Sequence, residues 1–116
     1  MDVGNRCWIE AEANARMPFT KAMRLLEIGS WTAPGQEEII CRKTIGPQVG
    51  EYVGLDMREG NGVDVVADAK SMPFPDNSFE VIISTDCLEH VDWPREVIHE
   101  AFRVTKPGGL FYLTTV

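Results

Sequence analysis

The sequence predicts an α/β domain built around a parallel β-sheet, and three observations lead to this class. Two short segments, Arg24–Gly29 and Glu80–Asp86, are apolar on both of their alternating faces, as strands are when a sheet is covered on both sides. Helix-forming segments alternate with the strand-like ones along the chain. Turns containing glycine or proline separate them. The 116 residues correspond to one small domain.

The first half of the chain contains the start of this alternation. Residues 1–23 are expected to form an N-terminal helical segment, because Trp8–Met17 is rich in helix formers and Pro18 ends the run. After the first strand, Gly35–Lys43 predicts a helix whose acidic first turn and basic last turn match the helix dipole. Glu51–Met57 predicts the second strand.

The second half continues the pattern. Val63–Ala69 alternates and predicts a strand nearer an edge, and Pro73–Phe79 is a turn-rich loop before the fourth strand. Trp93–Thr105 predicts an amphipathic helix, Lys106–Gly109 ends it, and Leu110–Val116 predicts the fifth strand. The apolar side of this helix is expected to comprise Val97, Ile98, Ala101, Phe102 and Val104.

Composition and charge narrow the classes of partner. The formal net charge of -7 makes nucleic acid an unlikely partner, because phosphate binding requires clustered Lys and Arg. No apolar run reaches the ~20 residues of a membrane span, and the N-terminus lacks the order of a signal peptide. We therefore expect a cytoplasmic protein without a membrane partner. Cys7, Cys41 and Cys87 match neither a zinc spacing nor a disulfide framework, and no metal site is expected.

Residues that follow the expected strands are the first candidates for a site. Sheets of this kind bind ligands beyond the carboxyl ends of their strands, where the strand order reverses. Any single residue there could be a solvated turn residue, but their joint placement favours a site. The candidates are Glu27 to Gly35, Asp56 and Met57, Asp68 and Ala69, and Ser84 to His90.

Several segments carry a family resemblance. Between Arg24 and Val116 the chain contains, in this order, "LEIGS", "YVGLDM", "ADAKSMPFPDNSFEVIIS", "LEH" and "VTKPGGLFYLTT". In this order and spacing, residues 24–116 resemble a class I S-adenosylmethionine-dependent methyltransferase domain. The resemblance implies a Rossmann-like sheet with strand order 3-2-1-4-5 and helices on both faces. It also implies S-adenosylmethionine as cofactor. Relatives continue after the fifth strand with antiparallel strands, whereas this sequence stops at Val116. We therefore expect either a fragment of a longer enzyme or a reduced domain whose exposed edge is covered by self-association.

The resemblance implies a role for each strand-end residue toward the nucleoside of the cofactor. The Asp56 carboxylate would accept hydrogen bonds from both ribose hydroxyls, because it has two acceptor oxygens. Met57 would pack on the adenine face. Asp68 would accept from the adenine amino group, and the backbone N–H of Ala69 would meet a ring nitrogen.

Other residues would hold the methionine part of the cofactor. The resemblance implies that Glu27 lies near the methionine ammonium and that Ser84 and Thr85 line the methionine arm. Gly29 would let the backbone approach the ligand closely, because it has no Cβ.

The loop after the first strand departs from the usual family pattern. Trp31 stands where a second glycine is expected, and glycine returns only at Gly35. Methyltransferases of glycan and lipopolysaccharide gene clusters show a similar variant. There, Ser30 begins a longer loop and Gly35 is the later glycine. The resemblance thus implies methyl transfer to an oxygen, nitrogen or carbon of a small-molecule or glycan acceptor.

Two alternatives stay open at this point. If the altered loop has lost the cofactor, the chain is an inactive methyltransferase-like domain that binds or scaffolds. A nicotinamide-dependent oxidoreductase is less favoured, because its G-x-G-x-x-G pattern after the first strand is absent.

His90 is the candidate catalytic residue. It is the only histidine near the expected site, and its ordinary pKa suits a general base. The alternative is that His90 only hydrogen-bonds the segment leading to Asp92.

The last strand predicts self-association. Leu110–Val116 is apolar and rich in β-forming residues, and sheets rarely leave such an edge bare. We expect a two-fold homodimer through this edge. The alternative is that Met1–Thr20 folds back over it.

Overall fold

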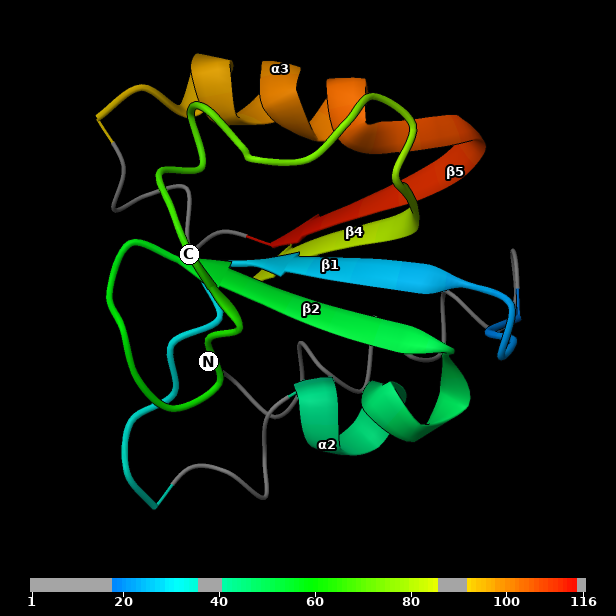
Figure 1. Cartoon of the computed structure of the whole chain (residues 1–116), viewed down its shortest axis with the longest axis horizontal. Coiled ribbons are helices and arrows are strands. Elements are labelled where there is room, and N and C mark those ends of the chain that lie inside the picture. The colour runs from blue at the N-terminus through cyan, green and yellow to red at the C-terminus, as the bar shows by residue number, and fades with distance from the viewer. Residues whose placement is uncertain (1–17, 36–40, 86–91, 115–116) are drawn as a thin grey trace.

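A computed structural model of the chain describes residues 18–35, 41–85 and 92–114. The expected helix Trp8–Met17, residues 36–40 of the second expected helix, Asp86 and His90 lie outside the described residues. The described part is a five-stranded parallel sheet with helices on both faces (Figure 1). Its strands are β1 (Arg24–Ile28), β2 (Glu51–Asp56), β3 (Val65–Val66), β4 (Phe79–Thr85) and β5 (Thr105–Thr114).

The strand order is β3-β2-β1-β4-β5, which confirms the predicted order and parallel direction. β1 lies in the centre and pairs with both β2 and β4, with Leu26 opposite Val53 on one side and Ile82 on the other. Leu25, Leu26 and Ile28 are fully buried because both faces of this central strand are covered. The strand order reverses at β1, and sheets of this kind bind ligands at such a switch point.

Two apolar clusters cover the two faces of the sheet. On one face, α3 (Pro94–Val104) packs on a cluster that contains Leu26, Ile28 and Ile82. On the other face, the short helix α2 (Cys41–Ile45) and the 3-10 turn η2 (Gly46–Gln48) adjoin a cluster that contains Leu25 and Ile83. Figure 1 shows α3 above the sheet and α2 below it. Alternate residues of each strand therefore serve opposite clusters.

The helix α3 begins at Pro94, as the sequence predicts, since proline suits the first helical turn. Val97, Ala101 and Val104 are buried, and Ile98 packs against the same cluster. The expectation for Phe102 was wrong: its side chain is 70% exposed. Its position lies beside the buried stripe of α3, facing away from the sheet.

The boundary between α3 and β5 also differs from the prediction. β5 begins at Thr105, directly after α3, so Lys106–Gly109 belongs to the strand and does not separate it from the helix. The pairing with β4 shifts register between Phe79 and Val81, which accommodates the extra residues. Gly109 has no room for a side chain there, because a Cβ would lie 2.7 Å from the Glu80 carbonyl oxygen.

β3 comprises only Val65–Val66 and is much shorter than the predicted strand Val63–Ala69. On either side of it, the backbone N–H groups of Asp64 and Ala67 still donate to the carbonyl oxygens of Gly54 and Asp56 in β2. The Asp64 carboxylate accepts the Gly54 N–H at 2.8 Å, and the Asp68 carboxylate accepts the Lys70 N–H at 2.9 Å. These local bonds compete with a regular ladder.

Arg103 fixes the segment that leads from β3 to β4 against α3. Its guanidinium donates to the carbonyl oxygens of Phe74 at 2.8 Å and Met72 at 3.0 Å. It also pairs with Glu100 at 2.7 Å and Asp76 at 2.9 Å. Because guanidinium presents five donors in one plane, a single side chain can serve all four partners. Within the described ranges, no helix combines the length and the apolar character that crossing a membrane would require.

Candidate functional site

The parallel sheet gathers the candidate residues at one edge. Glu27 lies near the carboxyl end of β1, Asp56 ends β2, and Ser84 and Thr85 end β4. The register places Ile28 opposite Ser84 and Glu27 opposite Gly54, so these strand ends are adjacent. Their proximity follows from the parallel direction that the sequence predicts.

The loop after β1 starts with a left-handed glycine. Gly29 has φ 76°, a conformation that glycine adopts without the steric cost of a Cβ. The N–H of Gly29 and that of Ser30 both donate to the Leu55 carbonyl oxygen, at 2.8 and 3.2 Å. The loop therefore turns toward β2. Gly35, also left-handed at φ 87°, is exposed in a turn, so the structure does not place it in the predicted helix.

Asp56 is held by backbone donors from two loops. Its Oδ2 accepts the N–H of Trp31 at 3.0 Å, and its Oδ1 accepts the N–H of Arg58 at 2.9 Å. A carboxylate has about four acceptor sites, so each oxygen can still accept another hydrogen bond. The carboxylate is thus fixed in position and keeps capacity for a ligand.

Trp31 takes part in an extensive contact between the loops that follow β1 and β2. The Arg58 guanidinium lies 3.5 Å from the centre of the Trp31 ring, which is a cation–π contact. The N–H of Thr32 donates to the Asn61 carbonyl oxygen at 2.8 Å. The second loop therefore accommodates the unusual Trp31 of the first loop. No pattern in the sequence pointed to Arg58 as the partner of Trp31.

Two hydroxyl groups near the strand ends are buried without a hydrogen bond. Within the described part of the chain, Ser30 Oγ and Ser84 Oγ have no partner, and both residues are at most 4% exposed. Leaving a buried hydroxyl unpaired costs about 1–3 kcal/mol. Such groups are typical of places where a ligand or an ordered water completes the bonding.

Glu27 is a buried acid with an altered pKa. Its carboxylate oxygen Oε1 accepts a hydrogen bond from the Tyr52 hydroxyl at 2.7 Å. Burial raises the pKa of Glu27 from 4.5 to about 7; the Tyr52 hydroxyl and the Arg42 guanidinium oppose the rise, and Asp56 adds to it. A group of this kind gains or loses a proton near neutral pH.

A charged network lies beside Glu27. The Arg42 guanidinium stacks 5.1 Å from the centre of the Tyr52 ring and pairs with Asp64. Partial burial opposes ionisation of Asp64, but hydrogen bonds from Arg42 and from the Gly54 N–H lower its pKa overall. The sequence reasoning did not identify Tyr52 or Arg42. A tyrosine in β2 and an arginine in α2 are common in sheets of this kind, so Tyr52 and Arg42 would have been only a weak signal of a site.

The remaining candidates lie further along the same edge. The Asp68 side chain accepts the Lys70 N–H, so Asp68 is a turn residue in this structure and could serve a ligand only with its other acceptor sites. Ala69 is 8% exposed and packs in the α3 cluster. Met57 is 70% exposed. Thr85 ends β4, and His90 lies outside the described residues, so its predicted role stays a prediction.

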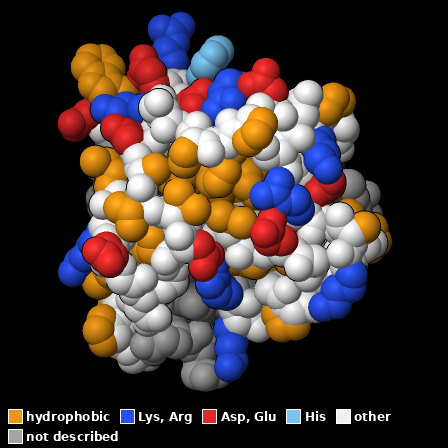
Figure 2. All heavy atoms as spheres, in the orientation of Figure 1, with side chains coloured by type: hydrophobic (Ala, Val, Ile, Leu, Met, Phe, Trp, Pro, Cys, Tyr) orange, Lys and Arg blue, Asp and Glu red, His pale blue; other side chains and the backbone are white. Residues whose placement is uncertain are grey.

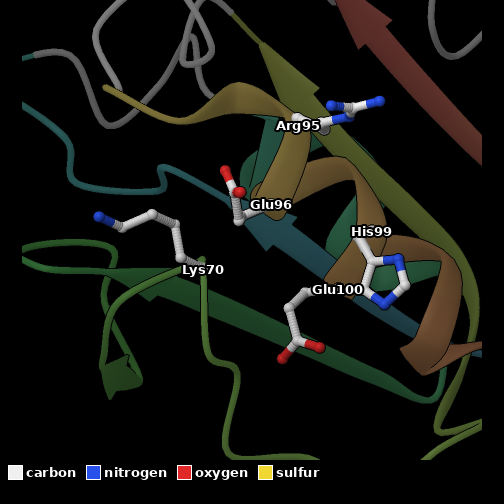
Figure 3. A pocket seen from close by; sticks show the side chains of 5 residues that line it. All are labelled: Lys70, Arg95, Glu96, His99 and Glu100. Carbon is white, nitrogen blue, oxygen red and sulfur yellow. The ribbon is translucent and has the colours of Figure 1, made fainter.

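A shallow pocket of about 310 Å³ lies between α3 and the segment after Asp68. Figure 3 shows Lys70 on one side and four residues of α3 on the other, with Arg95 extending away from Lys70. Figure 2 shows that charged side chains of both signs gather along the α3 edge of the molecule. The lining residues are Lys70, Arg95, Glu96, His99 and Glu100. The pocket contains none of the predicted cofactor residues.

The fold and the strand-end site define a class of enzyme, and a family match agrees with it. Residues 41–113 match a family model described as a methyltransferase domain. The chain belongs to the class I S-adenosylmethionine-dependent methyltransferases, as the sequence resemblance implies.

Curated relatives of the chain include two named methyltransferases of quinone biosynthesis. The chain is 34% identical over 110 residues to the demethylmenaquinone methyltransferase of Geobacillus kaustophilus, covering 82% of this chain and 46% of that protein. It is 44% identical over 126 residues to the ubiquinone/menaquinone biosynthesis C-methyltransferase UbiE of Roseobacter denitrificans, covering 94% of this chain and 48% of that protein. The chain thus spans about half the length of these relatives.

Solved structures confirm the Rossmann-like fold. The YcgJ protein of Bacillus subtilis superposes with a TM-score of 0.78 at 24% identity, covering 97% of this chain and 50% of that one. The [4+2]-cyclase SpnF superposes with a TM-score of 0.72 at 22% identity, covering 93% and 44%. Because one of these neighbours is named as a cyclase, the fold alone does not fix the reaction.

Proposed function

We propose that this chain contributes the cofactor-binding region of an S-adenosylmethionine-dependent methyltransferase. The observation that carries the proposal is Asp56. Its carboxylate stands at the end of β2, beside the reversal of strand order, and two backbone N–H groups hold it. Each of its oxygens keeps an acceptor site, which suits the two hydroxyls of a ribose.

Other features of the site fit the same cofactor. Gly29 gives the first loop its left-handed turn at the ligand-binding edge. The unpaired hydroxyls of Ser30 and Ser84 offer donors and acceptors there. Glu27 offers a carboxyl group that a ligand ammonium would convert to the charged form. Met57, Asp68 and Ala69 would face the adenine, and Ser84 and Thr85 the methionine arm.

The residues of this chain contribute mainly by positioning. The bound cofactor supplies a methyl group on a positively charged sulfur, which the acceptor takes by in-line displacement. Asp56 would fix the ribose and Glu27 the ammonium, and two fixed ends restrict the orientation of what lies between them. If the acceptor requires a base, His90 is the proposed residue.

For the acceptor we propose a ring carbon of a quinone precursor in its reduced, hydroquinone form. The electron-rich ring carbon would attack the methyl group, the bond from methyl to sulfur would break, and the ring carbon would then lose its proton to a base. Two relatives that align with most of this chain are named as a demethylmenaquinone methyltransferase and a C-methyltransferase of ubiquinone and menaquinone biosynthesis. These names favour a small aromatic acceptor. The glycan acceptor, which the Trp31-containing loop suggested, stays a prediction.

The cofactor part of the proposal is tested by calorimetric titration of the chain with S-adenosylhomocysteine and, separately, with NAD. Binding of S-adenosylhomocysteine alone is expected. Binding of NAD alone would support an oxidoreductase, and binding of neither would support a domain that has lost its cofactor site.

The acceptor part has its own test. The chain is incubated with methyl-labelled S-adenosylmethionine and demethylmenaquinone that dithionite keeps in its hydroquinone form, with a sugar nucleotide as the comparison. Label in the quinone carbon supports the proposal, whereas label only in the sugar would replace the quinone acceptor by a glycan.

A further inference from the structure

Trp31, Asp56 and Arg58 form one closed unit at the carboxyl end of β2. The two backbone N–H groups that bind the Asp56 carboxylate belong to Trp31 and Arg58, one in each loop. The side chains of the same two residues stack on each other at 3.5 Å. The carboxylate is therefore bound by the backbones of two residues whose side chains also hold the two loops together.

Glycines in the second loop make room for this unit. Gly60 has φ 142°, and a Cβ there would lie 2.8 Å from Nε1 of Trp31. Gly62 has φ 87°, and a Cβ there would lie 2.6 Å from the Ser30 carbonyl oxygen. The first loop has Trp31 where the family pattern has glycine, and the facing loop has two glycines at the points of contact. These glycines let the two loops approach closely.

The stack determines how firmly Asp56 is held. Asp56 is only partly buried, so hydrogen bonds, more than packing, define the position of its carboxylate. Both of those bonds come from loop backbone, and loops move more than the strands they join. The contact between Arg58 and Trp31 restrains both donors at once. A binding group restrained in this way loses less freedom when a ligand binds.

We propose that Trp31 and Arg58 are positioning residues that hold Asp56 ready for the ribose hydroxyls and so raise the affinity for the cofactor. The inference rests on the proposed function, because it takes the ribose as the ligand of Asp56. Arg58 is exposed and Trp31 is only half-buried, so the unit lies outside the apolar core. Loss of the contact between Trp31 and Arg58 should therefore change the affinity for the ligand more than the free energy of unfolding.

The test is a double-mutant cycle read by calorimetric titration with S-adenosylhomocysteine. Arg58→Ala should weaken binding by about twofold to fivefold, the range expected when an exposed cation–π contact is lost. In the Asp56→Ala background the same change should have no further effect, because the carboxylate that it positions is gone. Arg58→Lys should recover part of the affinity, since lysine keeps the cation but stacks less well.

The control is Arg95→Ala, which removes the same charge from an exposed position on α3, away from the strand ends. It should bind like the parent chain, and its thermal unfolding midpoint should match that of Arg58→Ala. Parental affinity in Arg58→Ala overturns the inference. An equal loss in both backgrounds also overturns it, because Arg58 would then act without Asp56. If the parent chain binds no S-adenosylhomocysteine, the proposed function fails first, which the parental titration shows by itself.

Discussion

The hydroxyl of Tyr52 donates a hydrogen bond of 2.7 Å to Oε1 of Glu27, across the neighbouring strands β1 and β2. Despite this donor, burial keeps the pKa of Glu27 at about 7. The acid therefore lies near the carboxyl edge of the sheet, and its protonation changes near neutral pH. A cation bound beside it would favour its charged form.

Replacing Glu27 by Gln should stabilise the fold at pH 8 and have little effect at pH 5. The folded-state pKa of Glu27 is raised, so the stability that this group contributes is present below its unfolded pKa of 4.5 and is lost as the pH rises through about 7. The loss is at most about 3–4 kcal/mol, since the pKa rises from 4.5 to about 7 and one pKa unit corresponds to ~1.4 kcal/mol. Urea unfolding of both chains at the two pH values measures it. Equal differences at pH 5 and pH 8 would contradict the assignment.

Replacing Arg103 by Ala should lower the free energy of unfolding by about 2–3 kcal/mol, because charge-assisted hydrogen bonds to four groups are lost together. Denaturant unfolding measures the change. Arg95→Ala on the same helix is the control and should stay within about 0.5 kcal/mol of the parent, as exposed substitutions usually do. If both variants unfold alike, Arg103 does not fix the β3–β4 segment.

Replacing Gly54 by Ala should destabilise the site edge. A Cβ at this position would lie 2.5 Å from Ser30 Oγ and closer still to the Gly62 carbonyl oxygen, so both loops would have to move. We expect a loss of about 1–3 kcal/mol from overpacking. Gly46→Ala is the matched control, because the nearest atom to its Cβ would be Arg42 Cγ at 3.7 Å. Thermal unfolding compares them, and equal midpoints would show that the loops adjust freely.

Self-association through β5 stays a prediction. In the described sheet β5 is an edge strand, and Leu113 is 38% exposed. We expect the 116-residue chain to form a two-fold dimer through this edge, since unpaired strand edges favour pairing. Light scattering at several concentrations measures the mass. A monomer at high concentration whose Leu110–Leu113 amides exchange slowly would contradict the expectation.

Much of the framework could be predicted from local sequence pattern. Apolar residues on both faces indicate a buried strand, and Leu25, Leu26 and Ile28 are fully buried as expected. Once the strands are parallel, the strand-end positions of Asp56 and Ser84 follow from topology. The predicted strand order, which the family resemblance implied, was confirmed.

The features that escaped prediction depend on contacts between distant segments. The stack of Arg58 on Trp31 depends on how two loops pack, which neither loop encodes alone. Beside the short β3, the Asp64 carboxylate accepts the N–H of Gly54, ten residues away along the chain. Phe102 is exposed because it lies beside the buried stripe of α3 and not within it. Its apolar character alone could not show on which side of that boundary it falls.

The most direct test of the account is calorimetric titration of S-adenosylhomocysteine into the parent chain and the Asp56→Ala variant. The carboxylate of Asp56 is expected to bind the ribose through charge-assisted hydrogen bonds, which contribute about 1.5–3 kcal/mol. The variant should therefore bind at least about tenfold more weakly than the parent. The same affinity in both chains would remove Asp56 from the site and contradict the account.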